Sequence, residues 1–158
     1  MSEKENQKAL VVYQTICSAL EARKWKYDKD ESELVIHFSV SGNSLPMKFV
    51  ILTDAGRQMI RVMVPLQQKF CEEKRLDGAI ATCAANYGMV DGGFDYDLSD
   101  GQVIFRATAS FRESIIGEGL VDYLISLSCA MVDKYSADFF ALDKGYLSLE
   151  DFINKASK

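Results

Sequence analysis

The side chains of this sequence that could carry out chemistry are one histidine, four cysteines and a group of aspartates. His37 is the single histidine and lies in a segment where apolar and polar residues alternate. A histidine metal site or a Ser-His-Asp triad needs partners that the pattern does not supply. We therefore predict that His37 is an ordinary strand residue at a sheet face.

The four cysteines are spread along the chain, and no two of them form a Cys-x-x-Cys pair. Cys17, Cys83 and Cys129 fall on or beside apolar helical faces, where a thiol behaves as a small hydrophobe. Cys71 is predicted to be the most exposed, but no basic neighbour is evident that would lower its pKa and activate it. The spacing predicts free thiols in a reducing cytosol.

The aspartates at positions 91, 95, 97 and 100 suggest a calcium loop, but the pattern fails at two places. A loop that starts at Asp95 has Asp100 where glycine is required and Arg106 where the bidentate glutamate belongs. We expect Asp95 and Asp97 to face solvent from one side of a strand and Asp100 to serve a turn.

A second calcium-like pattern at residues 145–152 copies the closing half of a helix-loop-helix site. Its opening half is missing, because Phe140, Leu142 and Lys144 stand where the first oxygen ligands belong. Ser148 is instead predicted to cap a short helix. No glycine-rich phosphate loop is present either, so we predict no catalytic site, no metal, no cofactor and no enzymatic activity.

The whole chain of 158 residues predicts one domain, 1–158, that can bury a sizeable core. Its net charge of −5 disfavours phosphate backbones, so nucleic acid is not an expected partner. The longest apolar runs are far shorter than the roughly 20 residues of a membrane span, and the mixed-charge start is unlike a secretion signal. The predicted location is the cytoplasm.

The hydrophobic periodicity predicts an α+β fold with the order helix, antiparallel meander, helix, β-hairpin, helix. Polar turns are expected at residues 28–32, 41–44 and 54–56, and an Asp-Gly turn inside the hairpin. The predicted elements are a helix at 4–24, strands at 34–40, 47–53 and 58–64, a helix at 70–87, strands at 92–98 and 103–111, and helices at 117–135 and 148–154.

The second predicted helix gathers its large apolar residues on one side, at Leu76, Ile80, Cys83 and Tyr87. The third carries Leu120, Leu124 and Leu127, but its apolar residues extend around much of the circumference. Such a helix must be covered on more than one side. A sheet with a partner subunit, or a sheet with the chain's own tail, would each satisfy it.

Several short motifs occur at the expected elements of one known family. This chain resembles the YbjN family of bacterial sensory-transduction regulators, whose fold is similar to that of class I type III secretion chaperones. The likeness extends to about residue 137, so residues 139–158 form a C-terminal extension relative to it. The motifs are Ala85-Asn86-Tyr87, Gly93-Phe94-Asp95-Tyr96-Asp97, Asp100-Gly101-Gln102-Val103-Ile104-Phe105-Arg106 and the segment from Gly119-Leu120 to Tyr135.

The resemblance implies a small, acidic, often dimeric bacterial protein that binds protein segments, with no cofactor and no catalytic residues to carry over. We therefore expect a homodimeric protein-binding regulator or chaperone-like module. A client segment would pair with an edge strand or place apolar anchors in pockets. The predicted contacts are one outward set of the meander together with the third helix: Met47, Phe49 and Ile51, or else Lys48, Val50 and Leu52, with Leu120, Leu124 and Leu127.

The alternative is a small-molecule sensor with an apolar pocket between the sheet and the helices. Tyr13, Trp25, Tyr96 and Phe105 are the aromatic side chains that would line this pocket.

Overall fold

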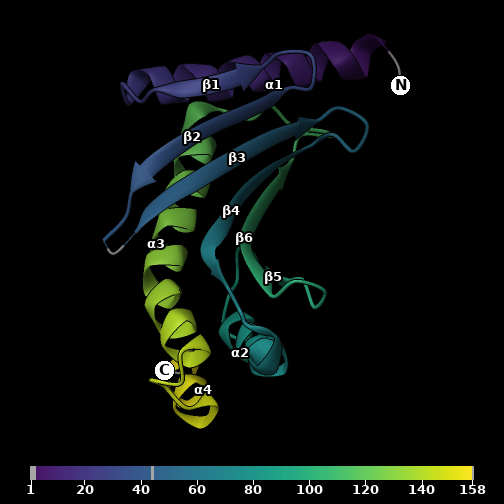
Figure 1. Cartoon of the computed structure of the whole chain (residues 1–158). Helices are drawn as coiled ribbons and strands as arrows, with labels where there is room; N and C mark the ends of the chain where they lie inside the picture. Colours follow the sequence, from purple (N-terminus) through teal and green to yellow (C-terminus); the bar gives the residue numbers. More distant parts are fainter. Residues whose placement is uncertain (1–2, 44, 158) are drawn as a thin grey trace.

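The computed structural model describes residues 3–43 and 45–157. Ser44, in the predicted turn at 41–44, lies outside the described residues, as do Met1, Ser2 and Lys158. The predicted α+β order is confirmed (Figure 1). The elements are α1 (Glu3–Ala22), β1 (Tyr27–Asp30), β2 (Val35–Ser41), β3 (Pro46–Asp54), β4 (Met59–Lys69), the 3-10 helix η1 (Glu72–Lys74), α2 (Arg75–Asn86), β5 (Gly93–Tyr96), β6 (Gln102–Ser110), α3 (Glu118–Asp143) and α4 (Leu149–Ala156).

The strands form one antiparallel sheet in the order β1-β2-β3-β4-β6-β5. The predicted meander and hairpin are joined because β4 pairs with β6, which sets Met63 opposite Arg106. The prediction of a polar turn at 28–32 is wrong in part, since Asp28 lies opposite His37 in the edge strand β1. Charged residues are common on edge strands because they discourage pairing with other chains.

The helices lie on one side of the sheet, and no described part of the chain covers the other side. In Figure 1, α1 crosses one end, α3 passes behind β2 and β3, and α2 and α4 lie together at the far end. Alternate strand residues point to the helices and are buried, as the period of two requires. They include Ile36, Phe38, Met47, Phe49, Ile51, Ile60, Val62, Val64, Val103, Phe105 and Ala107.

α3 is longer than predicted and ends at Asp143, so the first part of the predicted extension continues this helix. Phe139 is buried, and its ring lies 5.1 Å from that of Phe152 on α4. The predicted cap of α4 is confirmed, because the Ser148 hydroxyl accepts a hydrogen bond from the backbone N–H of Asp151 at 3.1 Å. The tail thus covers one side of α3, which is one of the two covers that the sequence left open.

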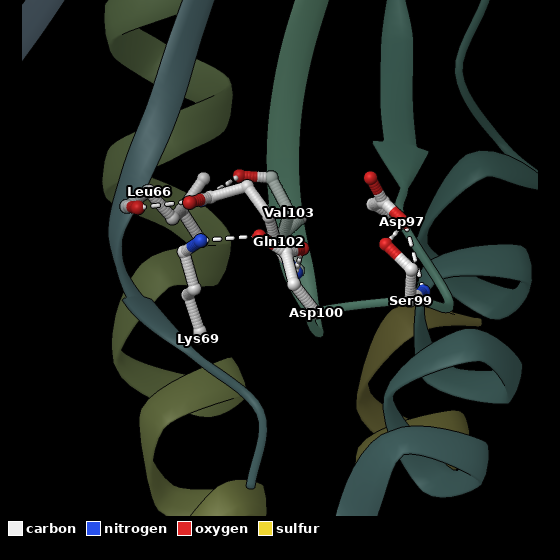
Figure 2. A network of polar contacts seen from close by, with 7 residues as sticks. All are labelled: Leu66, Lys69, Asp97, Ser99, Asp100, Gln102 and Val103. Carbon is white, nitrogen blue, oxygen red and sulfur yellow. Dashed lines mark hydrogen bonds and ion pairs between the residues drawn. The ribbon is translucent and has the colours of Figure 1, made fainter. Parts of the chain in front are cut away.

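The β5–β6 turn is the predicted Asp-Gly turn, held by its own polar side chains (Figure 2). Gly101 has φ of +77°, and a Cβ there would lie 2.3 Å from the Phe70 carbonyl oxygen, so the position requires glycine. The Gln102 amide donates to the Leu66 carbonyl at 2.8 Å, and Lys69 forms an ion pair with Asp100. These contacts anchor the turn to β4 where the β4–β6 register shifts.

Asn86, at the end of α2, supplies the bonds that a neighbouring strand would give to β5. Its side-chain oxygen accepts from the Phe94 N–H at 2.7 Å, and its amide donates to the Phe94 carbonyl at 2.8 Å. The motif Ala85-Asn86-Tyr87 therefore has a structural role, which is to satisfy the backbone at this edge of the sheet.

Candidate functional site

A stripe of large apolar side chains lies on the outside of α2. We call Leu76, Ile80, Cys83 and Tyr87 the α2 stripe; Leu76 is 69% exposed, Ile80 40% and Tyr87 93%, and Cys83 is also exposed. The prediction that Cys83 is a covered small hydrophobe is therefore wrong. Exposed apolar residues are ordinary when single, but a contiguous set on one helix face is typical of an interaction surface.

The stripe faces outward because α2 packs through its small residues. Gly78, Ala81 and Ala85 are buried on the opposite side of the helix. A Cβ at Gly78 would lie 2.7 Å from the Phe70 ring and from the Tyr96 hydroxyl, so the helix approaches closely only on this side. The larger residues are left on the other face.

A groove continues from the end of the stripe along α3. It has a volume of about 490 Å³ and lies between the loop that follows α2 and the exposed side of α3. The Tyr123 hydroxyl donates to the Asp91 carboxylate at 2.5 Å across this groove, and that hydrogen bond raises the pKa of the tyrosine. The apolar lining is Tyr87, Met89, Val90, Tyr123, Leu127 and Met131.

The three leucines predicted as contacts on the third helix have different environments. Leu127 lines the groove, Leu120 is 38% exposed near the start of α3, and Leu124 is 4% exposed and belongs to the core. The structure brings Leu127 beside the loop at Tyr87, which the sequence did not place near it.

The predicted sheet contacts Met47, Phe49 and Ile51 are buried at 3%, 1% and 1% exposure. They point to the helical layer, where Phe49 stacks on Phe38 at 4.7 Å between ring centroids. Of the two alternatives, the outward set is therefore Lys48, Val50 and Leu52. The sequence could not decide this, because both sets alternate with the same period.

The open side of the sheet carries a second hollow, of about 540 Å³, that spans β1, β2, β3 and β4. Lys26, His37 and Lys48 line it beside Val50 and Pro65. This side of the sheet is uncovered by the described residues of the chain, and its apolar residues are partly exposed. Two lysines, a histidine and apolar side chains thus share one hollow.

The groups considered for catalysis lack the environment that would activate them. Burial raises the pKa of the Cys17 and Cys129 thiols. Desolvation, followed by the neighbouring Glu73 and Asp143 carboxylates, raises the pKa of Cys71. A thiol with a raised pKa is a poor nucleophile at neutral pH.

Asp143 is a buried carboxylate beside Cys71. Burial acts to raise its pKa, but the Lys144 ammonium and the Cys71 N–H, which donates to it at 2.7 Å, hold that pKa below its usual value. Its role is therefore to join the end of α3 to the start of η1. Among the described residues, no three histidine, cysteine or acidic side chains gather in a group that could hold a metal ion.

The aromatic residues predicted for a sensor pocket have unequal burial. Tyr13 and Phe105 are core residues at 2% and 0% exposure, and Trp25 and Tyr96 pack against the core while partly buried. The small-molecule pocket between sheet and helices remains a prediction. No helix among the described residues is long and apolar enough to cross a membrane.

The α2 stripe and the hollow on the open sheet face were not recognised as sites from the sequence. One signal for the stripe was present, because its spacing of four, three and four is complemented by glycine and alanines on the opposite face. The hollow joins residues from four strands that are distant in sequence, so no local pattern could reveal it.

No protein-family model and no curated protein matches this sequence. Two solved structures share its fold. YbjN from E. coli, described as "a putative transcription regulator", matches with a TM-score of 0.57 and 9% identity, over 82% of this chain and 94% of that chain. A chain of the HopA1–SchA chaperone–effector complex matches with a TM-score of 0.54 and 9% identity, over 81% of this chain and 94% of that chain. The predicted likeness in fold is confirmed.

Proposed function

We propose that this chain is a non-enzymatic protein-binding module of the cytosol that acts as a homodimer. The observation that carries the proposal is the α2 stripe, which the described residues of this chain leave exposed. Interaction surfaces are rich in large apolar and aromatic side chains of this kind, and Tyr87, at 93% exposure, is a residue type common among hot spots.

A second copy of the chain fits the stripe because the spacing of its residues along the helix, four, three and four, is the same when the helix is reversed. If two α2 helices pack antiparallel about a two-fold axis, Leu76 faces Tyr87 of the other copy and Ile80 faces Cys83. Ala79 and Ala84 face each other beside them, so two helices could approach to about 8–10 Å. Apolar residues then meet apolar residues on both sides of the axis.

Two further observations support a client-binding role. One of the solved structures with this fold comes from a chaperone–effector complex, in which a protein is bound. A dimer formed through α2 would also leave the open face of each sheet free, since α2 lies on the helical side. The dimer surface and the client surface are thus separate in this proposal.

The test is cross-linking through Cys83 together with light scattering. In the antiparallel arrangement the two Cys83 Cα atoms are offset by three residues, or about 4.5 Å along the axis, within reach of a short bismaleimide. We expect a dimer mass and a cross-linked dimer that persists with Cys71→Ser and is lost with Cys83→Ser. Cys71 is the matched control because it is also exposed but lies before η1.

A monomer mass at all concentrations would contradict the proposed dimer. A cross-link that depends on Cys71 instead of Cys83 would place the interface elsewhere and would remove the α2 stripe from it.

A further inference from the structure

The hollow on the open face of the sheet gathers positive charge on an acidic protein. The chain has a net charge of −5, yet Lys26, His37 and Lys48 line this one hollow, with Asp28 as its single acidic side chain. Neither Lys26 nor Lys48 forms an ion pair within the part of the chain that the structure describes.

Two arginines of the open face already have carboxylate partners. The Arg61 guanidinium lies 3.5 Å from the Asp54 carboxylate, and Arg106 forms a bidentate pair with Asp95 at 2.6 and 2.8 Å. The available positive charge on this side of the sheet is therefore concentrated at the hollow.

The strand register places the two lysines at a useful separation. Ser39 lies opposite Lys48 on β3, and Lys26 immediately precedes β1, whose Tyr27 lies opposite Phe38. Lys26 and Lys48 are thus two strands apart, or about 10 Å. Two carboxylates two or four positions apart on one face of an extended chain, about 7 or 13 Å from each other, could each meet one flexible lysine.

The floor between these cations is apolar. Val50 and Pro65 line the hollow, and Pro65 lies opposite Ile104 on the next strand. Because side chains two positions apart in an extended segment point to the same face, an apolar side chain two positions from a carboxylate would contact this floor while the carboxylate pairs with a lysine. An anion without apolar groups would pair with the lysines but would leave the apolar floor without a contact.

We propose that this hollow binds an extended, acidic segment of a protein partner, in which carboxylates and apolar side chains follow each other at every second position and so lie on the same face of the segment. The inference rests on the proposed function and specifies the chemistry of the partner. A nucleic acid fits less well, because the acidic surface around two lysines repels a phosphate backbone. The attraction would act at the open face and would leave the α2 stripe free.

The test measures fluorescence anisotropy of a short labelled peptide in which glutamate and leucine take turns at every second position with serine between them, and the same peptide with glutamine in place of glutamate is its neutral counterpart. The double variant Lys26→Glu with Lys48→Glu changes the net charge from −5 to −9, since each change subtracts two. The matched control, Lys4→Glu with Lys24→Glu, reaches the same −9 at exposed positions on and beside α1.

We expect the wild type and the control to bind the acidic peptide and the hollow variant to bind it at least about tenfold more weakly. Raising the salt from about 50 to about 300 mM should weaken binding severalfold, because the pairs are exposed and screened. The neutral peptide should bind more weakly than the acidic one. If the double variant fails to fold, the single changes Lys26→Gln and Lys48→Gln replace it.

Equal binding of the acidic peptide to wild type, control and hollow variant would overturn the inference. Tighter binding of a single-stranded oligonucleotide at the same residues would overturn it as well. If the Cys83 cross-link forms while the lysine changes have no effect, this inference alone fails. A monomeric protein that still binds the acidic peptide through its lysines would instead contradict only the proposed dimer.

Discussion

Replacing Leu76 by aspartate is expected to separate the two copies of the chain without unfolding either one. Leu76 is 69% exposed in the single chain. Complete burial of a leucine side chain stabilises by about 1.5–3 kcal/mol, so covering the exposed part contributes about 1–2 kcal/mol. The two-fold interface contains the residue twice, so the substitution removes about 2–4 kcal/mol of dimerisation free energy. This loss corresponds to a rise in the dimer Kd of about 30- to 700-fold.

The fold of the single chain should tolerate this change. Position 76 is in the first turn of α2, where a negative side chain interacts favourably with the helix dipole. We therefore expect the free energy of unfolding of the monomer, measured with urea at low protein concentration, to change by no more than about 0.5 kcal/mol.

Sedimentation equilibrium measures the dimer Kd, and Leu98→Asp is the matched control. Leu98 is 64% exposed, close to the value for Leu76, but it lies in the turn between β5 and β6. The reasoning is refuted if both variants weaken the dimer equally, or if Leu76→Asp leaves the Kd unchanged. Loss of about 2 kcal/mol or more in monomer stability would also refute it, because Leu76 would then be part of the core.

Two further predictions concern the fold. Asn86→Asp keeps the acceptor for the Phe94 N–H but sets a carboxylate against the Phe94 carbonyl, so we expect a loss of about 1–3 kcal/mol in urea unfolding; an unchanged midpoint would contradict the edge-closing role. Phe152→Ala is expected to cost about 3–5 kcal/mol, since its ring is 1% exposed. Tyr146→Ala, at 79% exposure, should change the free energy of unfolding by no more than about 0.5 kcal/mol. A loss for Phe152→Ala as small as that for Tyr146→Ala would show that α4 is not packed on the core.

The elements that could be predicted from the sequence are those that depend on neighbouring residues. The Asp-Gly turn requires a residue with φ above zero, and Gly101 supplies it. Ser148 caps α4 through a backbone group three residues away. The alternation in β3 correctly separates Met47, Phe49 and Ile51 from Lys48, Val50 and Leu52, because side chains on a strand point to opposite faces.

Which face of α2 and of β3 is buried could not be predicted from neighbouring residues. Large apolar residues on one side of a helix are normally its core side, and the opposite holds in α2, where Gly78 permits a close approach that larger residues would prevent. In β3 the chosen face follows from the side on which α1 and α3 pack. These are contacts between segments far apart in the chain, and periodicity carries no information about them.

Apart from the edge strand β1, the sequence by itself thus determined the order of the elements, the Asp-Gly turn and the Ser148 cap, and the division of each predicted strand and helix into an apolar and a polar or small-residue face. Only the tertiary structure decided which of those faces meet. The physical reason is that periodicity arises within one element, whereas burial depends on which other element lies against it. The exposed α2 stripe and the hollow at Lys26, His37 and Lys48 both result from which elements pack against each other.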